Sequence, residues 1–515
     1  MPEYLAPGVY VEEIELGPRP IEGVNTGVAG FVGQTERGPT IATLVTSWRD
    51  YSSWFGEYID EGSTDASTAV FLPYAVQGFF DNGGQRLFVA RVVGTGSTKA
   101  SANLGSVLIE AIGAGEWGNN VLVAVKAASN VDSYSKGEFR IQVAYYRDGI
   151  PDPFIDPTAQ DQLKNSKRIS PDVFEEFDNL SANAEDANFA AAIINAHSRL
   201  IAIRELNTIP PFAKFPSFQL QNGSTVKAGV EDYAGEAIND SEPTGLRALS
   251  NNRDISIIAA PDEVVIDELK KRVIDSCEAT KDRFAVISEQ QNVSANNAHT
   301  PRDTSYAAFY YPWLRVPAPH LRDGHRLVPA HGHIAGIFAR VDSEHGVHKA
   351  PVNEVVRGID SNQPLEFTIT KREQDLLNPR SVNVIRDFRT EGRGVLLYGA
   401  RTMSSDSIWR YVNVRRLIIF IEQSIDRGTQ WVVFEANTEK TWSAMRSTIT
   451  NFLTTVWRNG ALQGAKAEEA FFVKCDRTTM TQDDLDNGRL ICVIGVAPVK
   501  PAEFVILRFS HRITE

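Results

Sequence analysis

The chain has 515 residues, a length that corresponds to about three domains and that can bury a large apolar core. Hydrophobic residues make up 42% of it and charged residues 23%, with 37 Gly and 25 Pro, so the composition excludes a disordered or fibrous protein. Lys and Arg total 52 against 65 Asp and Glu, and the resulting net charge of −13 disfavours binding to nucleic acid.

The first predicted element is an extended strand close to the amino terminus. Val9 and Val11 alternate with Tyr10 and Glu12, which is the two-residue period of a β-strand. Prolines stand on both sides of it and disfavour a tight hairpin, so the strand has no local partner. We predict that residues 1–22 form an arm. They also lack the basic and apolar segments of a standard signal peptide.

Residues 23–104 are predicted to form the first part of an α/β core. A buried strand of small residues spans 23–33, an apolar helix pattern centres on 70–80, and a strand covers 87–93. The glycines of the first strand do not have the spacing of a nucleotide-binding loop, and no P-loop Lys follows them. We therefore interpret them as sites of close packing: Gly27, Gly30 and Gly33.

Two insertions are predicted after this first part of the core. Residues 105–180 contain short strands, such as 121–125 and 139–146, with close turns between them, which indicates a small β-rich insertion. Residues 181–250 are rich in Ala, Asn, Ser and Gly and show weak periodicity apart from a helical stretch near 189–200. We interpret this second segment as a variable surface insertion.

The core resumes at residues 251–390. A buried strand at 254–260, an amphipathic helix at 262–280 and a second strand at 284–288 form a βαβ unit. Such a unit implies parallel strands joined by a right-handed crossover.

The C-terminal third contains two predicted helices and a terminal strand. Apolar residues recur at helical spacing in 414–425 and in 442–456, and these helices lie in a C-terminal domain at 391–500. The last segment, 501–515, alternates apolar and polar residues, and prolines separate it from the preceding strand. We predict that it forms a second arm.

A long apolar strand at the extreme terminus of a chain must pair with something or aggregate, and the prolines beside both terminal strands disfavour a tight hairpin. Both ends therefore indicate strand donation to a neighbouring copy, and mutual donation between identical chains builds rings or open helical filaments. The residues that we expect in the donated strands are Val9, Tyr10, Val11, Ile14, Phe504, Val505, Ile506, Leu507 and Phe509.

One motif suggests a hydrolase. His331-Gly-His-Ile-Ala-Gly336 is similar to the histidine motif of subtilisin-like proteases. A serine protease also needs a nucleophile on a tight glycine-flanked turn, and the chain contains neither Gly-x-Ser-x-Gly nor Gly-Thr-Ser-Met-Ala. We predict a protein without catalytic residues, cofactors or metals, and a degenerate subtilisin-type hydrolase is the alternative.

A second alternative is a histidine-rich metal protein, because an H-x-H pair can ligate zinc if further ligands converge. Against a metal site, an H-x-H pair on a strand puts both rings on one face, and the other histidines lie among Pro, Arg and Asp residues that are typical of solvated loops. Polar loop histidines are therefore the favoured interpretation. Cys475 and Cys492 lie in apolar strand contexts, which favours small core residues over metal ligands. Three cysteines are too few for a disulfide framework, and their odd number indicates folding in a reducing compartment. The clustered histidines are His320, His325, His331, His333, His345 and His348.

Several blocks of the sequence resemble the sheath proteins of contractile tails, which occur in myophages, R-type bacteriocins and extracellular contractile injection systems. The blocks are Tyr4-Leu-Ala-Pro-Gly-Val-Tyr-Val-Glu-Glu13, Gly115-Glu-Trp-Gly-Asn-Asn120, Gly346-Val-His-Lys-Ala-Pro-Val-Asn-Glu354, and Ala470-Phe-Phe-Val-Lys-Cys-Asp476 through Ile494-Gly-Val-Ala-Pro-Val-Lys-Pro-Ala-Glu-Phe-Val505. They span both ends and much of the middle of the chain. Residues 181–250 resemble the family least.

The resemblance implies a mechanical function. Sheath subunits form a helical stack of hexameric rings around an inner tube, assemble in an extended metastable state, and contract to drive the tube through a target envelope. The resemblance also implies a subtilisin-like α/β core without protease chemistry and a C-terminal mixed-sheet domain that arms of adjacent subunits complete.

The resemblance implies several partners: copies of the same chain, the inner tube protein, and baseplate and terminal cap proteins. It leaves open an AAA+ ATPase for disassembly. Synthesis in the bacterial cytoplasm is expected, without membrane insertion, for a component of a phage tail or a tail-like particle. Whether that particle is a phage, a bacteriocin or a released injection system stays open.

Charge indicates where a tube contact would lie. Residues 371–458 carry 14 Lys and Arg against 9 Asp and Glu, so this stretch is basic in an acidic chain. A basic C-terminal domain can hold an acidic tube through an array of screened surface pairs. The candidates are Arg410, Arg415, Arg416 and Arg427, with ordinary solvated helix charges as the alternative.

Overall fold

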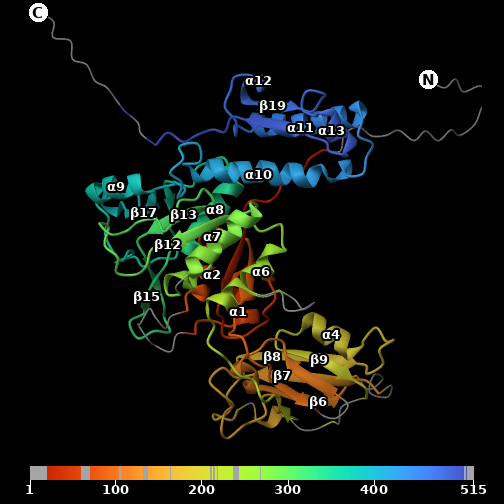
Figure 1. Ribbon diagram of the computed structural model, residues 1–515. Helices are drawn as coiled ribbons and strands as arrows, with labels where there is room; N and C mark the ends of the chain where they lie inside the picture. Colours follow the sequence, from red (N-terminus) through yellow and green to blue (C-terminus); the bar gives the residue numbers. More distant parts are fainter. Residues whose placement is uncertain are drawn as a thin grey trace, which may run out of the picture. The chain divides into compact units, whose positions relative to one another are not determined.

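A computed structural model describes residues 20–59, 70–103, 107–130, 137–162, 164–208, 212, 215–216, 218–235, 243–266, 268–503 and 506. These residues divide into two compact units (Figure 1). The larger unit consists of Thr26–Gly346 and Ala350–Val412. The smaller unit holds residues 20–25, Val347–Lys349 and the described chain from Asn413 onward.

The larger unit is built on a nine-stranded sheet. The neighbouring strands from β17 to β3 run parallel, and antiparallel strands close both edges. The strand order is β16 (Glu354–Val355), β18 (Val395–Leu397), β17 (Val382–Asp387), β13 (Ala307–Tyr311), β12 (Phe284–Ser288), β11 (Ile257–Ala259), β1 (Val28–Gly33), β3 (Arg86–Arg91) and β2 (Thr43–Val45).

Side chains of the central strands are buried on both faces of this sheet, because helices cover both faces. In β1, Ala29 and Phe31 face one apolar cluster, whereas Val28 and Val32 face the other. The first cluster includes residues of α1 (Trp48–Phe55), α2 (Leu72–Asp81) and α8 (His331–His345). The second includes residues of α5 (Val230–Ala234), α6 (Gly245–Ser250), α7 (Leu269–Thr280) and α9 (Lys371–Leu377). The predicted α/β class is confirmed.

The predicted βαβ unit is present. β11 and β12 are parallel, and α7 lies between them in the chain. The helix begins at Leu269 rather than at residue 262, because Pro261–Val264 form a short 3-10 helix whose residues are buried. The earlier predictions of a strand in 23–33, a helix at 70–80 and a strand at 87–93 are confirmed by β1, α2 and β3.

Glycines of the first strand lie at points of close packing, as predicted. A Cβ added to Gly33 would stand 2.9 Å from the Cβ of Leu72, and one added to Gly30 would stand 3.0 Å from Cγ2 of Ile255. Glycine is needed at these two positions because a side chain would collide with the neighbouring residues, and no bound ligand is required to explain it.

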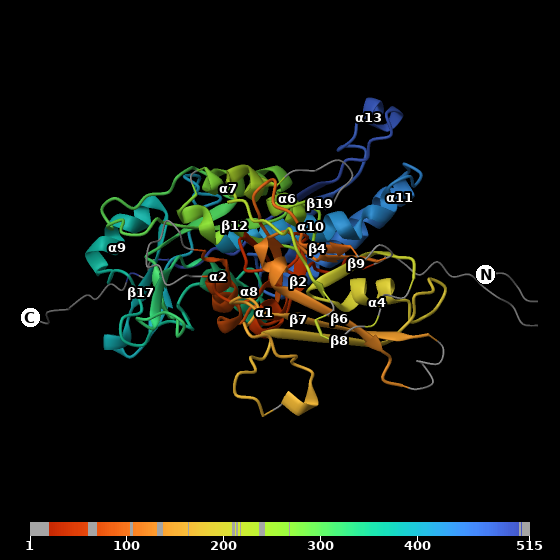
Figure 2. The same ribbon diagram turned by 90° about the horizontal axis from the view of Figure 1, so that it is seen from below.

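A β-rich insertion follows β3 in the same unit. One sheet has the order β10 (Phe218–Gln219), β6 (Val121–Ala127), β7 (Phe139–Tyr145) and β8 (Val173–Leu180), and another has the order β4 (Ser101–Asn103), β5 (Val107–Ala111) and β9 (Ile201–Leu206). Figure 2 shows β6, β7 and β8 side by side. Strands from the segments 105–180 and 181–250 pair here, β9 with β5 and β10 with β6. Helix α4 (Ala190–His197) places Ile194 in the same core. A separate hairpin joins β14 (Leu314–Pro317) to β15 (His325–Val328).

The smaller unit packs two long helices against a two-stranded sheet. α10 (Val412–Gly428) and α11 (Glu439–Arg458) confirm the helices predicted at 414–425 and 442–456. The remaining elements are α12 (Ala467–Ala470), β19 (Phe471–Lys474), α13 (Gln482–Asp486) and β20 (Val493–Val496).

Both predicted arms lie largely outside the described residues. Of the residues expected in the donated strands, only Ile506 is described, and its exposed fraction is 76%. No helix in the described ranges is long and apolar enough to span a membrane.

Candidate functional site

β19 and β20 form an antiparallel sheet with one covered face. The register runs from Phe471 opposite Val496 to Lys474 opposite Val493. Phe471, Val473 and Ile494 belong to an apolar cluster that also contains residues of α10 and α11. The helices therefore support this sheet from one side.

The other face of the sheet is open. Phe472 is 57% exposed and Val493 is 43% exposed. The Phe472 ring covers its cross-strand partner Gly495, where an added Cβ would stand 2.2 Å from a ring atom. Within the described chain no third strand pairs with β19 or β20. The outer edges and the apolar face thus have the features that an added strand uses.

The roots of both arms are fixed on this smaller unit. Near the amino terminus, Ile21 is buried and the Val24 N–H donates to Ser424 Oγ at 3.1 Å. Near the carboxyl terminus, the Val499 N–H donates to the Ala461 carbonyl at 3.1 Å. One unit therefore carries the open sheet and the starting points of both predicted arms.

The loop between α10 and α11 exposes an apolar pair that periodicity did not single out. Val433 is 60% exposed and Phe434 is fully exposed. Phe434 has a φ of 69°, which is rare for a bulky side chain. The available signal was the apolar run 431–434 between two predicted helices. Adjoining exposed apolar side chains often mark interaction sites.

The four arginines predicted for a tube contact differ in exposure. Arg415 and Arg416 are 6% and 4% exposed, whereas Arg410 and Arg427 are half-buried. Arg410 and Arg427 therefore offer more surface to a partner. The contact itself stays a prediction.

Two family models match the chain. One, described as the phage tail sheath protein central domain, matches residues 227–403, and the other, described as the phage tail sheath C-terminal domain, matches residues 404–512. The two matched segments adjoin and together cover more than half of the chain. The chain belongs to the phage tail sheath protein family. This confirms the resemblance inferred from the sequence blocks.

Known relatives agree with this family. The tail sheath protein of Salmonella phage ViI is 25% identical to this sheath chain over 300 residues, which are 55% of this chain and 45% of the relative. The matched stretch thus spans less than half of that relative's length.

Solved sheath structures show the same fold. The sheath complex of an extracellular contractile injection system, PVC, in its contracted state has a TM-score of 0.58 and 22% identity, covering 100% of this chain and 99% of that chain. The helical sheath of the anti-feeding prophage (AFP) in its contracted state has a TM-score of 0.57 and 23% identity, covering 98% and 99%.

The histidine motif of the sheath chain is buried at the start of a helix, so the expectations of a strand and of polar loop histidines were both wrong for His331 and His333. Both lie in the first turns of α8, 0% and 1% exposed. Gly332 explains this burial, because it lets α8 approach α2 closely. Burial lowers the pKa of His333 to about 4, so its ring is neutral near pH 7.

His331 belongs to a closed polar cluster. Its Nε2 lies 3.0 Å from Oε1 of Glu263, and both side chains are 0% exposed. The same Glu263 oxygen accepts the Ser288 N–H at 2.9 Å. Because Glu263 contacts both His331 of α8 and Ser288 of β12, the cluster fixes α8 to the sheet. A polymeric substrate cannot reach groups that are buried to this degree. Within the described ranges, no group of three His, Cys, Asp or Glu residues is arranged to hold a metal ion.

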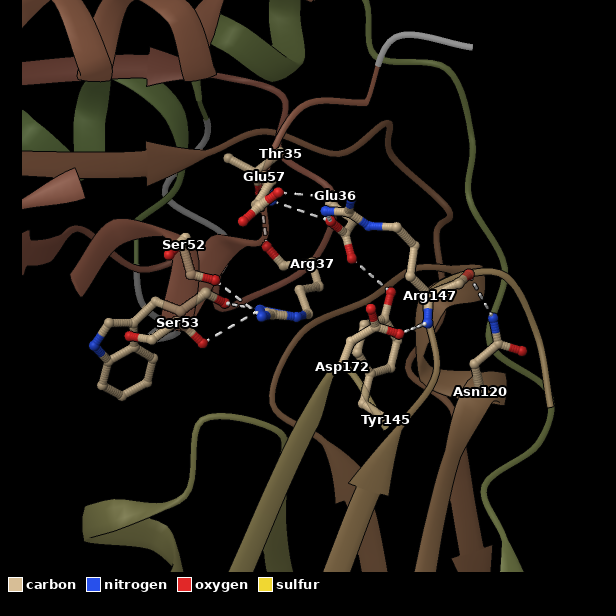
Figure 3. Close-up of polar contacts among 11 residues, drawn as sticks. Thr35, Glu36, Arg37, Ser52, Ser53, Glu57, Asn120, Tyr145, Arg147 and Asp172 are labelled. Carbon is tan, nitrogen blue, oxygen red and sulfur yellow. Dashed lines mark hydrogen bonds and ion pairs between the residues drawn. The ribbon is translucent and has the colours of Figure 1, made fainter. Parts of the chain in front are cut away.

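A second polar cluster joins the insertion to the core of the larger unit (Figure 3). Glu36, in the loop after β1, accepts hydrogen bonds from the Tyr145 hydroxyl at 2.7 Å and from the Arg147 guanidinium. The neighbouring Arg37 guanidinium donates to the Ser52 carbonyl at 2.9 Å and lies over the Tyr145 ring. Burial by itself would raise the pKa of Glu36, but the hydrogen bonds from Arg147 and Tyr145 hold that pKa below its ordinary value.

A cavity of about 740 Å³ adjoins this junction. The charged residues that line it carry both signs. This mixture favours a solvated gap between the insertion and the core over a binding site for an ionic ligand. The charged lining residues are Arg37, Arg49, Arg147, Arg199, Glu36, Glu57, Asp172, Glu175 and Glu176.

Glu36→Gln is expected to loosen the junction. The ionised carboxylate is the acceptor, so its contribution is complete above the ordinary pKa of 4.5 and disappears as the pH falls through the lowered folded-state pKa. We expect E36Q to lose about 1–3 kcal/mol of unfolding free energy at pH 7. In thermal unfolding measured from pH 7 to pH 3, the difference in melting temperature between the wild type and E36Q should shrink as the pH falls.

Glu57→Gln is the matched control. The Glu57 side chain is 56% exposed and lies 4.0 Å from the Arg147 guanidinium, so its loss should cost little. Equal melting of E36Q and wild type at pH 7 would contradict the role given to Glu36.

Proposed function

We propose that this chain is the subunit of a contractile tail sheath that polymerises around an inner tube in an extended metastable state and contracts to drive the tube through a target envelope. Membership of the tail sheath family supports a structural rather than an enzymatic role. The observation that carries the mechanism is the open two-stranded sheet β19–β20, which lies in the unit where both arms have their roots.

In this proposal the two arms of one subunit pair with the β19–β20 sheets of neighbouring subunits. Each copy is then both donor and acceptor, which gives the head-to-tail contact that builds rings and helical filaments. The exposed Phe472 and Val493 gain apolar neighbours from alternating residues of the arms.

Magnitudes favour two arms over one. Four to six ladder hydrogen bonds contribute about 0.5–1.5 kcal/mol each, and two or three buried apolar side chains contribute about 1.5–3 kcal/mol each. One strand therefore contributes about 5–18 kcal/mol, which is comparable to the cost of association. Two donated strands per subunit exceed that cost.

Further partners belong to the same proposal. They are an inner tube, which Arg410 and Arg427 would contact, and baseplate and terminal cap proteins, with an AAA+ ATPase for disassembly left open. We place synthesis in the bacterial cytoplasm and the assembled protein in a phage tail or tail-like particle. A subtilisin-like α/β core without protease chemistry would account for the His331 motif as shared architecture rather than as a site.

Val493→Asp tests the acceptor sheet. A charge on the open face should disfavour an added strand without disturbing the covered face. Since a buried Val contributes about 1.5–3 kcal/mol, we expect the concentration needed for polymerisation to rise about 10–100-fold, as measured by sedimentation and electron microscopy.

The matched control is Val226→Asp, because Val226 is also 43% exposed but lies outside the smaller unit. It should polymerise like the wild type. If V493D formed sheaths at the same protein concentration as the wild type, strand addition at this sheet would be contradicted.

A further inference from the structure

Two cysteines face each other at the end of the open sheet. Lys474 of β19 is opposite Val493 of β20, so the next opposite pair in this antiparallel register is Cys475 and Cys492. We propose that these two residues form a cross-strand disulfide when a small-molecule disulfide such as glutathione disulfide reaches the protein. In the structure both are free thiols.

The geometry suits a disulfide. Both side chains belong to one small cluster with Trp442 and Met480, and the two thiols hydrogen-bond to each other. Opposite residues in antiparallel strands have Cα atoms about 4.5–5.5 Å apart. This separation lies within the roughly 4.4–6.8 Å that a disulfide spans, so the bond needs no large backbone movement.

Exposure decides which thiol reacts first. Cys475 is 1% exposed, whereas Cys492 is half-buried and is flanked by Ile491 and Val493, both exposed. Cys492 is therefore the thiol that an oxidant in solution meets. Cys277 is 0% exposed and lies in the other unit, so it serves as an internal reference.

The chemistry proceeds by two exchanges. The Cys492 thiolate attacks glutathione disulfide, a bond forms between Cys492 Sγ and one glutathione sulfur, and the first glutathione thiolate leaves. The Cys475 thiolate then attacks Cys492 Sγ and displaces the second glutathione. The two thiol protons pass through solvent to the two glutathione thiolates, so one disulfide is reduced for each one formed.

Formation is slow near neutral pH. Burial, followed by the neighbouring Cys475 thiol, raises the pKa of Cys492 to about 12, so little thiolate is present at pH 7. The chain thus stays reduced through folding in a reducing compartment and oxidises later. We expect the initial rate to rise about tenfold per pH unit between pH 7 and 9.

The bond would close the base of the loop at residues 476–491. This loop already carries internal contacts, such as the Thr479 hydroxyl donating to the Ile491 carbonyl at 2.9 Å. A covalent closure restricts opening of the loop and of the adjoining ends of β19 and β20. The bond lies away from the open face that carries Phe472, so strand addition stays sterically possible.

Peptide mapping of the full chain tests the proposal. After incubation with glutathione disulfide at pH 8.5 and alkylation, we expect one linked peptide pair containing Cys475 and Cys492, with Cys277 alkylated. Amide exchange at β19 and β20 should slow on oxidation and recover on reduction. A stable glutathione adduct on Cys492, disulfides between chains, or two alkylated thiols would overturn the proposal.

Two variants complete the test. Cys475→Ser should stop at the Cys492–glutathione adduct, and Cys277→Ala should form the linked pair like the wild type. Loss of the linked pair in C277A would show that the reaction involves Cys277 and would also overturn the proposal. Because mapping uses the unpolymerised chain, the outcome does not depend on whether sheaths form.

Discussion

We expect a chain that lacks residues 502–515 to fold and to remain monomeric. The root of the C-terminal arm is kept, since the Val499 N–H bond to the Ala461 carbonyl lies before the deletion. Removal of one donated strand takes away about 5–18 kcal/mol of contact free energy, which should raise the concentration needed for polymerisation more than about a thousandfold. Deletion of residues 1–16 should have the same effect.

Sedimentation and electron microscopy measure this outcome, and circular dichroism checks folding. A matched pair of full-length chains separates strand pairing from chain length. Changing Val505, Leu507 and Phe509 to Ser removes one apolar face of the arm and should abolish polymerisation, whereas changing Arg508 and Arg512 to Gln on the opposite face should not. Long sheaths from either truncation would reject the arm mechanism.

The largest loss of stability is expected from Gly332→Ala. A Cβ at this position would stand 1.8 Å from the Ala75 carbonyl oxygen, so α8 and α2 would have to move apart. Alanine is favoured over glycine in a helix by only about 1 kcal/mol. Overpacking of this severity costs about 3 kcal/mol or more and therefore dominates.

Thermal unfolding of the larger unit should show a midpoint about 4 °C or more below that of the wild type, because the unfolding entropy of so large a unit converts 1 kcal/mol into little more than about 1 °C. Gly229→Ala is the control, because its φ is −107° and an added Cβ would have only an ordinary contact, 3.8 Å from Asp232 Oδ2. If G332A melted within 2 °C of the wild type, the close packing of α8 on α2 would be wrong.

Long periodic segments could be predicted from sequence, and non-local pairing could not. α10 and α11 repeat apolar residues at helical spacing over several turns, so their faces are evident in the sequence. In contrast, the pairing of β9 with β5 joins segments about a hundred residues apart, and no local pattern specifies that register. The late start of α7 depends on the buried turn at Pro261–Val264, which an amphipathic pattern conceals.

The candidate site follows the same division. The apolar sequence around Cys475 and Cys492 indicated strands, and β19 and β20 lie beside these two residues. Hydropathy alone predicts burial for Phe472 and Phe434, which the structure exposes. The burial of His331 and His333 depends on the approach of α8 to α2, a tertiary contact between segments that are far apart in the chain. Exposure and burial of single residues were therefore the features that sequence left open.

A cryo-electron microscopy map of the assembled sheath tests the central claim most directly. The proposal predicts that residues 4–14 and 504–513 of each copy extend beyond their own subunit and add strands to the β19–β20 sheets of neighbouring copies. A map in which both ends pair only within their own subunit, with no chain crossing between copies, would contradict it.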